Sequence, residues 1–253
     1  MLTLPQEPGP RHRLYETMVE HIYGQELSAG DSFIDLGGNI GHHTWRMGLK
    51  VGSEGRGFAI EPVPDFAQRI RNVLANKKVD WVDVVNVAAA DYDGECSFFV
   101  QPDHIGWSSM FSDHVHPGDS AESAQEITVP VKVLDDTVDV ADSSLRVIKV
   151  DVENAEFPAL RGCSKLIEAH KPVVIFENDP VGAARRGDYE IADFLTFFSS
   201  LGYEVWSLHG PKMATAEDWA SSDSSYYLAT PKSLGSGGVI AEYELDELVA
   251  NFT

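Results

Sequence analysis

Cysteine and long apolar runs are both scarce in this chain of 253 residues. Its two cysteines, Cys96 and Cys163, stand far apart and outside any Cys-x-x-Cys or Cys/His metal spacing, so we expect neither a disulfide framework nor a zinc site. No stretch approaches the roughly 18 unbroken apolar residues of a membrane span, and the N-terminus has no apolar core of signal-peptide length. The sequence therefore predicts a cytoplasmic protein.

Positive charge is also in short supply. The chain carries 19 Lys and Arg against 40 Asp and Glu, which gives a formal net charge of -21. A surface this negative repels phosphate backbones and anionic lipid headgroups. We therefore expect neither nucleic acid nor membrane as a partner, and the sequence gives no sign of the oligomeric state.

What the chain does contain is enough apolar residues, 43% of the total, for one sizeable core. Leu14, Met18, Ile22 and Tyr23 recur at helical spacing, which predicts an amphipathic helix at the edge of that core. We expect an N-terminal extension with this helix over residues 1–28, a main domain over residues 29–232, and a helical C-terminal segment over residues 233–253.

Strand-like apolar runs alternate with helical patterns along the main domain. The expected strands include SFIDLG, GRGFAIEP, LRVIKVD and KPVVIFE. The run VDWVDVVNVAAAD is long enough to predict a third strand at the centre of the sheet. Strands that alternate with helices of roughly 10 to 15 residues predict an α/β fold, in which helices cover both faces of a mostly parallel sheet.

The middle of the chain interrupts this alternation. Two expected strands, GECSFFVQ and QEITVPVKVLDD, are separated by a polar loop over residues 102–124. A loop of this length in a compact domain is either a functional segment or a disordered one. We favour a lid over a bound ligand, with a plain turn as the alternative.

Acidic residues close most of the expected strands. In parallel sheets, ligands bind at the carboxyl ends of the strands. The residues at these ends are Asp35, Glu61, Ala88, Asp151 and Glu177. The sequence therefore predicts a binding site rich in carboxylates.

The turn after the first strand, DLGGNIG, has glycines at positions 37, 38 and 41, which permit positive φ and let a ligand approach the backbone closely. It is not a dinucleotide fingerprint, because Asn39 and His42 occupy the second and third glycine positions counted from Gly37. No Gly-Lys-Ser/Thr follows either. A pyrophosphate ligand is disfavoured, and a nicotinamide-dependent oxidoreductase is kept only as an alternative.

Two carboxylates indicate what the turn holds instead. Glu61 follows Gly41 by 20 residues, the spacing at which a carboxylate accepts hydrogen bonds from the hydroxyls of an adenosine ribose. Asp35 would repel phosphates, but it suits a cationic ligand. S-adenosylmethionine meets both demands, because it combines an adenosine with a sulfonium and an ammonium group and has no phosphate.

An ordered set of motifs resembles the FkbM family of S-adenosylmethionine-dependent methyltransferases. The set is FIDLGGNIGHHT, FAIEPVPDFAQRIRNVLAN, VVNVAAADYDGE, GWSSM, VLDD, VIKVDVENAEFPALRGC and KPVVIFEN, over roughly residues 30 to 230. The resemblance implies the class I methyltransferase fold, a Rossmann-like seven-stranded sheet with one antiparallel strand near its end. It also implies O-methylation of a hydroxyl on a small molecule such as a sugar, a polyketide or a related natural product.

Carried over position by position, the resemblance implies a cofactor site. Asp35 and the glycine turn would line the methionine part, Glu61 would hold the ribose, Ala88 would lie by the adenine, and Ser109 would lie at the cofactor's edge. The residues that we expect to bind the cofactor are Asp35, Gly37, Gly38, Asn39, Gly41, Glu61, Pro62, Ala88, Ser109 and Asp151.

The same resemblance places Asp151 and Glu153 in the family's acidic K-x-D-x-E-G-x-E segment, where this chain has Asn154 in place of the family's glycine. That departure keeps open a non-catalytic, interaction-domain alternative. A hydroxyl acceptor needs a base to take its proton. The candidates are Asp151, Glu153, Glu177 and the loop histidines, His104 above all, with His114 and His116 beside it.

A metal is not part of the expected site. Asp151, Glu153 and Glu177 with a loop histidine would suit a divalent cation, but no spacing specifies such a set. His42 and His43 are expected to begin a helix rather than to take part in chemistry.

Overall fold

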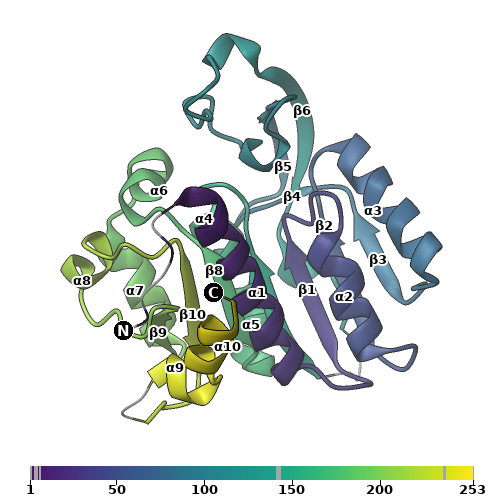
Figure 1. The fold of residues 1–253 in the computed structure, drawn as a ribbon. Helices are drawn as coiled ribbons and strands as arrows, with labels where there is room; N and C mark the ends of the chain where they lie inside the picture. Colours follow the sequence, from purple (N-terminus) through teal and green to yellow (C-terminus); the bar gives the residue numbers. More distant parts are fainter. Residues whose placement is uncertain (1, 3–4, 6, 141–143, 236–237, 253) are drawn as a thin grey trace.

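The computed structural model of the chain describes residues 2, 5, 7–140, 144–235 and 238–252, and it is built on one seven-stranded sheet (Figure 1). In spatial order the strands are β3 (Val82–Val85), β2 (Arg56–Ile60), β1 (Ser32–Leu36), β7 (Leu145–Val150), β8 (Val173–Glu177), β10 (Tyr226–Thr230) and β9 (Glu204–Ser207). Strand β10 is antiparallel to both of its neighbours, and the other pairs are parallel. The expected α/β fold with a mostly parallel sheet of seven strands is confirmed.

Helices cover both faces of this sheet, and each face has its own apolar core. One core gathers buried residues of α1 (Pro8–Glu26), α2 (His42–Val51), α3 (Pro64–Lys77), α9 (Gly238–Glu242) and α10 (Leu245–Phe252). The other gathers those of α4 (Glu156–Arg161), α5 (Ser164–His170), α7 (Ile191–Ser200) and α8 (Ala216–Ala220), and α6 (Pro180–Gly187) packs beside α4, α7 and α8. Two layers of helices thus cover the faces of the sheet, as a buried parallel sheet requires.

The first and last helices of the described chain pack together on one face of the sheet. Helix α1 lies along the sheet beside α10, so segments from the N- and C-terminal parts of the sequence are neighbours (Figure 1). Leu14, Met18 and Ile22 on α1 are fully buried, at the helical spacing read from the sequence. No helix in the described ranges is both long enough and apolar enough to cross a membrane.

A second, smaller sheet stands above the carboxyl ends of the main strands (Figure 1). Its order is β4 (Ala88–Ala89), β6 (Gln125–Lys132) and β5 (Gly94–Val100), and its apolar face packs on α3 through Phe66, Phe98 and Val129. The long segment between β5 and β6 carries 3₁₀ turns at Ile105–Trp107 and Ala121–Ser123, and a third lies at Leu134–Asp136. This small sheet covers the carboxyl ends of the main strands, where ligands of such folds bind.

The expectation of a long, central third strand is wrong. The run divides into β3, at the edge of the main sheet, and β4, in the small sheet. The break falls at Asn86, whose side-chain amide donates to the carbonyls of Glu61 and Pro62 at 2.8 and 2.9 Å. Asp83 is exposed within β3, so this part of the run has the one-sided burial of an edge strand.

Candidate functional site

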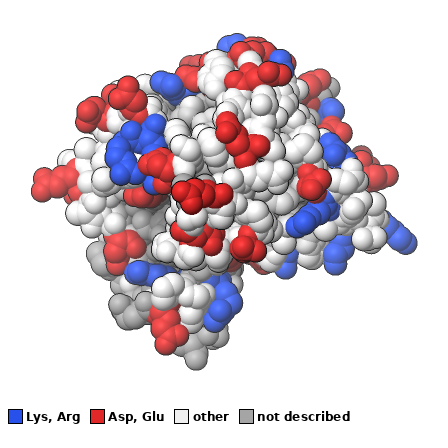
Figure 2. Space-filling view, turned by 90° about the horizontal axis from the view of Figure 1, so that it is seen from above, with Lys and Arg blue, Asp and Glu red and all other residues white. Residues whose placement is uncertain are grey.

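A cavity of about 360 Å³ lies at the carboxyl ends of β1, β2, β7 and β8. Its walls come from the turn after β1, the ends of β2 and β7, strand β4, segment 105–110 and helix α1. In the view from above these strand ends, acidic side chains lie across the middle of the face, and basic ones are grouped toward its edges (Figure 2). The parallel sheet thus gathers the strand-closing residues around one hollow.

The glycine turn makes the closest backbone approach in the site. Gly37 has φ 77°, and a Cβ atom there would lie 1.8 Å from the carbonyl oxygen of Asp151. The amides of Gly37 and Gly38 donate to the carbonyl of Ile60 at 3.0 and 3.2 Å. Asn39 also takes positive φ, 49°, which asparagine tolerates better than most residues. Only glycine fits at position 37.

The carboxyl group of Glu61 is fixed by two backbone amides. Asn39 N donates to Oε2 and Val63 N donates to Oε1, both at 2.8 Å, and the residue is 4% exposed. Burial raises the pKa of Glu61 to about 7, although these two hydrogen bonds oppose the rise. Each carboxylate oxygen keeps a further lone pair, so the group can still accept hydrogen bonds from a ligand in the cavity.

Lys149 is the cation of the site, and sequence reasoning gave it no role. Its ammonium lies 3.2 Å from Asp151 Oδ2 and 3.7 Å from Asp35 Oδ1. Burial opposes the charge, but the two carboxylates outweigh it and raise the pKa of Lys149. Thr44 Oγ1 donates to Asp35 Oδ2 at 2.6 Å, whereas Asp35 Oδ1 accepts no hydrogen bond from the described residues. The sequence signal was a lysine between Ile148 and Val150, two apolar residues at the carboxyl end of an expected strand.

Two further carboxylates, Glu153 and Glu177, also line the cavity. Burial and the nearby charge of Asp151 raise the pKa of both groups well above the ordinary value. Glu177 closes β8 opposite Tyr226 of β10, and the nearby Tyr226 hydroxyl opposes the rise in the pKa of Glu177. His114 Nε2 donates to Glu153 Oε2 at 2.8 Å. The cavity thus offers carboxyl groups whose proton affinity is increased by their surroundings.

Asn154, at the family's glycine position, keeps the backbone conformation that a glycine would take. Its φ is 77°. Its side chain donates to His114 Nδ1 and accepts from Arg186, both at 3.1 Å. Burial lowers the pKa of His114 to about 4, so this imidazole is neutral with its proton on Nε2, as the bond to Glu153 requires. The substitution therefore ties the long loop to α6 without deforming the turn.

Most of the expected site residues lie around the same cavity, but Gly41, Ser109 and the three loop histidines, His104, His114 and His116, do not line it. Gly41 directly precedes α2 with φ 84°, and Ser109 is fully buried, with its hydroxyl donating to the carbonyl of Glu153 at 2.6 Å. His104 pairs instead with Asp119 Oδ2 at 2.7 Å and stacks on His116. The expected residues that do line the cavity are Asp35, Gly37, Gly38, Asn39, Glu61, Pro62, Ala88, Asp151, Glu153 and Glu177.

Helices α1 and α2 contribute residues that the sequence did not assign to the site. His12 and Glu16 of α1 line the cavity, and so do His42 and His43, which begin α2 as expected. Glu16 accepts from His43 Nε2 at 2.9 Å and from the Tyr226 hydroxyl at 3.0 Å. The available signal was an acidic residue between Tyr15 and Met18, both buried, on an amphipathic helix.

Comparison with known proteins identifies a family. A model described as the methyltransferase FkbM domain matches residues 35–205. Methyltransferase 1 of Beauveria bassiana (strain ARSEF 2860) is 28% identical over 232 residues, which cover 86% of this chain and 87% of that protein.

Several solved structures share the fold. The O-methyltransferase TomG from Streptomyces achromogenes, solved with S-adenosylmethionine, aligns with a TM-score of 0.50 and 13% identity over 87% of this chain and 80% of that one. A candidate rRNA methylase from Clostridium thermocellum aligns with a TM-score of 0.51 and 12% identity over 92% of this chain and 100% of that one.

An FkbM methyltransferase from Methylobacillus flagellatus KT aligns with a TM-score of 0.49 and 18% identity. The alignment covers 83% of this chain, which spans 50% of that longer one. Because the family model covers more than half of the sequence and the fold is that of class I methyltransferases, this chain belongs to the FkbM family of methyltransferases.

Proposed function

We propose that this chain binds S-adenosylmethionine and transfers its methyl group to a hydroxyl oxygen of a small molecule, such as a sugar, a polyketide or a related natural product. The observation that carries the proposal is Glu61, whose carboxyl group is fixed by two amides at the cavity wall beside the Gly37 turn. A buried carboxyl group held in this way is suited to accept both hydroxyls of a ribose.

The remaining residues of the cradle fit the same cofactor. Asp35 and Asp151 place two carboxylates at the end of the glycine turn, and Lys149 offsets only part of their charge. Asp35 Oδ1 lies in the ion pair with Lys149 but accepts no hydrogen bond from the described residues, so a ligand ammonium could supply the missing donor to this buried acceptor. When bound, the cofactor supplies an activated methyl group on its sulfonium.

The protein must position the acceptor and take its proton. Asp151, Glu153 and Glu177 are the carboxyl groups that line the cavity near the turn. Their raised pKa values make the ionised forms of Glu153 and Glu177 stronger bases than an ordinary carboxylate. Single-turnover methyl transfer by Asp151→Asn, Glu153→Gln and Glu177→Gln distinguishes them: the variant of the base loses about 10²- to 10⁴-fold in rate and keeps its affinity for S-adenosylhomocysteine.

Calorimetric titration tests the cofactor. We expect S-adenosylhomocysteine to bind and NAD not to bind, and the reverse result would favour the oxidoreductase alternative. Glu61→Ala should weaken S-adenosylhomocysteine binding by about 1 to 3 kcal/mol, because charge-assisted hydrogen bonds are lost. Glu54→Ala, at an exposed turn, is the matched control and should leave the affinity unchanged. Screening hydroxylated sugars and polyketides with a labelled methyl donor then identifies the acceptor.

A further inference from the structure

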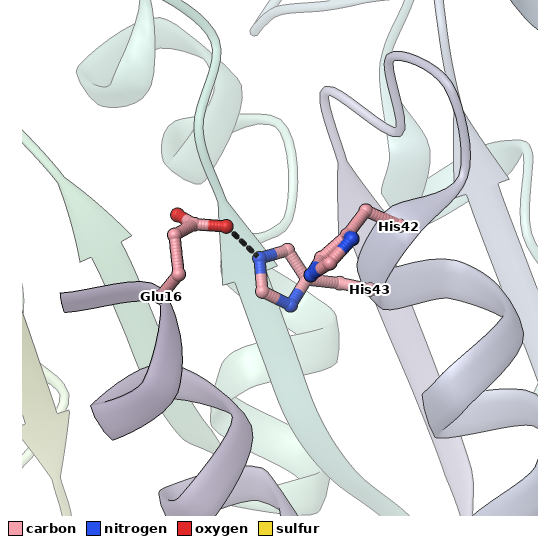
Figure 3. A group of neighbouring side chains, drawn as sticks. All are labelled: Glu16, His42 and His43. Carbon is pink, nitrogen blue, oxygen red and sulfur yellow. Dashed lines mark hydrogen bonds and ion pairs between the residues drawn. The ribbon is translucent and has the colours of Figure 1, made fainter. Parts of the chain in front are cut away.

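Three potential metal ligands meet where α1 passes the beginning of α2. Glu16, His42 and His43 each offer one ligand atom, and these atoms lie within 4.8 Å of one another. All three residues line the cavity. Figure 3 shows the carboxylate of Glu16 pointing from α1 toward the two rings of α2, with the hydrogen bond to His43 drawn. Two elements distant in sequence thus bring two imidazoles and one carboxylate together.

Neighbouring side chains fix the orientation of this group. The Tyr23 hydroxyl lies 3.3 Å from His43 Nδ1, while His43 Nε2 faces Glu16 Oε2 at 2.9 Å. The other oxygen of Glu16 accepts from the Tyr226 hydroxyl at 3.0 Å. Outer partners of this kind orient the ligating histidines and carboxylates of metal sites. The ligand atoms are therefore held in place before any ion arrives.

Two side chains compete for His42. Glu20 Oε1 lies 2.9 Å from its Nε2, and Arg46 lies 3.2 Å from its Nδ1. An ion would replace one of these partners and leave the other in contact with the ring. Since Arg46 also pairs with Glu20 at 3.1 Å, Glu20 is already neutralised, and Glu16 is the carboxylate left to bind an ion.

A second group, His104, His116 and Asp119, also brings three potential ligand atoms within 4.8 Å of one another, but it differs in position. It lies on the loop over residues 102–124, and none of its members lines the cavity. The rings of His104 and His116 stack with centroids 3.5 Å apart. This group is therefore a useful comparison, because it offers the same kinds of ligand on residues that do not line the cavity.

We propose that Glu16, His42 and His43 form a binding site for a divalent transition-metal ion of the zinc class. Two imidazoles and one carboxylate are a donor set that such ions take, and three protein ligands leave a coordination position open. Because all three residues line the cavity, a ligand in the cavity could reach such an ion. The site itself is independent of the proposed function, but its use rests on it: an acceptor hydroxyl bound to the ion would lose its proton more readily to a nearby carboxylate.

Cobalt titration tests the site in the full chain. After treatment with a chelator, Co²⁺ should bind at one ion per chain with visible absorption bands, and Zn²⁺ should displace it. Glu16→Gln and His43→Ala should each weaken binding by more than roughly tenfold. An absence of Co²⁺ binding, or equal affinity in both variants and the parent chain, overturns the proposal.

The second group supplies the matched control. The double variant His104→Ala/His116→Ala should bind Co²⁺ as the parent does. If this variant loses the ion and His43→Ala keeps it, the ion lies on the loop and the proposal is wrong. Circular dichroism and the urea midpoint show that each variant is folded. Titration with S-adenosylhomocysteine in the absence of metal is scored separately, so that its failure would contradict the proposed function and leave the metal result standing.

Discussion

Gly37 is the residue at which the backbone of the site is most tightly constrained. A side chain there meets two obstacles, a positive φ of 77° and the carbonyl of Asp151 at 1.8 Å from the added Cβ. Gly30→Ala is the matched control, because Gly30 has φ 90° and no atom within 4 Å of its added Cβ. We expect Gly30→Ala to lower the free energy of unfolding by about 1 kcal/mol, and Gly37→Ala to lower it by several kcal/mol. Urea denaturation measures both, and equal losses would contradict the close approach.

The titration of Glu61 predicts how cofactor affinity depends on pH. Burial raises the pKa of this carboxyl from 4.5 to about 7. Between these two pH values the folded chain therefore keeps a proton on Glu61 that the unfolded chain has lost. The contribution of Glu61 to stability therefore falls as pH rises from about 4.5 to 7. Ribose hydroxyls donate to the ionised form, so S-adenosylhomocysteine should bind about tenfold more tightly at pH 8 than at pH 6.

Calorimetry in both buffers measures this change in affinity. Glu61→Gln is the control, because an amide does not titrate and its weaker binding should vary less between the two pH values. If the parent and Glu61→Gln change in parallel, another group causes the pH dependence, and Glu153 and Glu177 are the next candidates.

For single residues, the sequence predicted a place in the site where the residue ends a strand, but not where its place depends on side-chain contacts. Asp35, Glu61 and Asp151 were found because residues that close parallel strands share one edge. The contacts of His114 with Glu153 and Asn154 depend on how a 23-residue loop, residues 102–124, folds back. Nothing in the spacing of the loop histidines distinguishes His114 from His104.

Helix α1 is the element whose removal from the sheet would open the cavity on one side. Met18 is fully buried between α1 and the core beneath it. Met18→Ala should lower the free energy of unfolding by about 2 to 5 kcal/mol, because it leaves a cavity. Arg13→Ala, at an exposed position of the same helix, should change it by less than about 0.5 kcal/mol.

The number of transitions in the unfolding curve shows whether α1 unfolds together with the sheet. If α1 unfolds together with the sheet, both variants keep a single transition in urea when followed by fluorescence and by circular dichroism. A separate early transition in Met18→Ala would instead show that residues 1–28 behave as an independent extension.

Elements were predicted where burial and periodicity agree, as in the fully buried strand β1 and the amphipathic helix α1. The prediction of one long third strand was wrong because the apolar run in the sequence continues through a turn. Asn86 directs the chain from one sheet into another by bonding two carbonyls, and a polar side chain within an apolar run does not reveal this. Likewise, no pattern in the sequence shows that α1 passes over the end of the sheet, where Glu16 meets His43.

For the whole molecule, the net charge of -21 predicts that salt stabilises the fold. Repulsion among like charges opposes compaction, and raising ionic strength from 0.1 to 1 M shortens the screening length from about 10 to about 3 Å. We expect the Tm at pH 7.5 to rise with added NaCl, by about 2 to 4 °C for each kcal/mol of repulsion relieved. Near pH 4.6, the isoelectric point, the rise should vanish. A Tm that falls with salt at pH 7.5 would show that local ion pairs outweigh the repulsion.

The cavity is lined both by residues inside the match to the family and by residues outside it. The match to the family begins at residue 35, yet His12 and Glu16 on α1 form part of the wall. A helix attached to the sheet by packing can diverge between relatives while the glycine turn and Glu61 stay as they are. Under the proposed function, exchanging residues 8–26 between members of the family should therefore change the preferred acceptor and leave the turn at Gly37 and the carboxyl group of Glu61 in place.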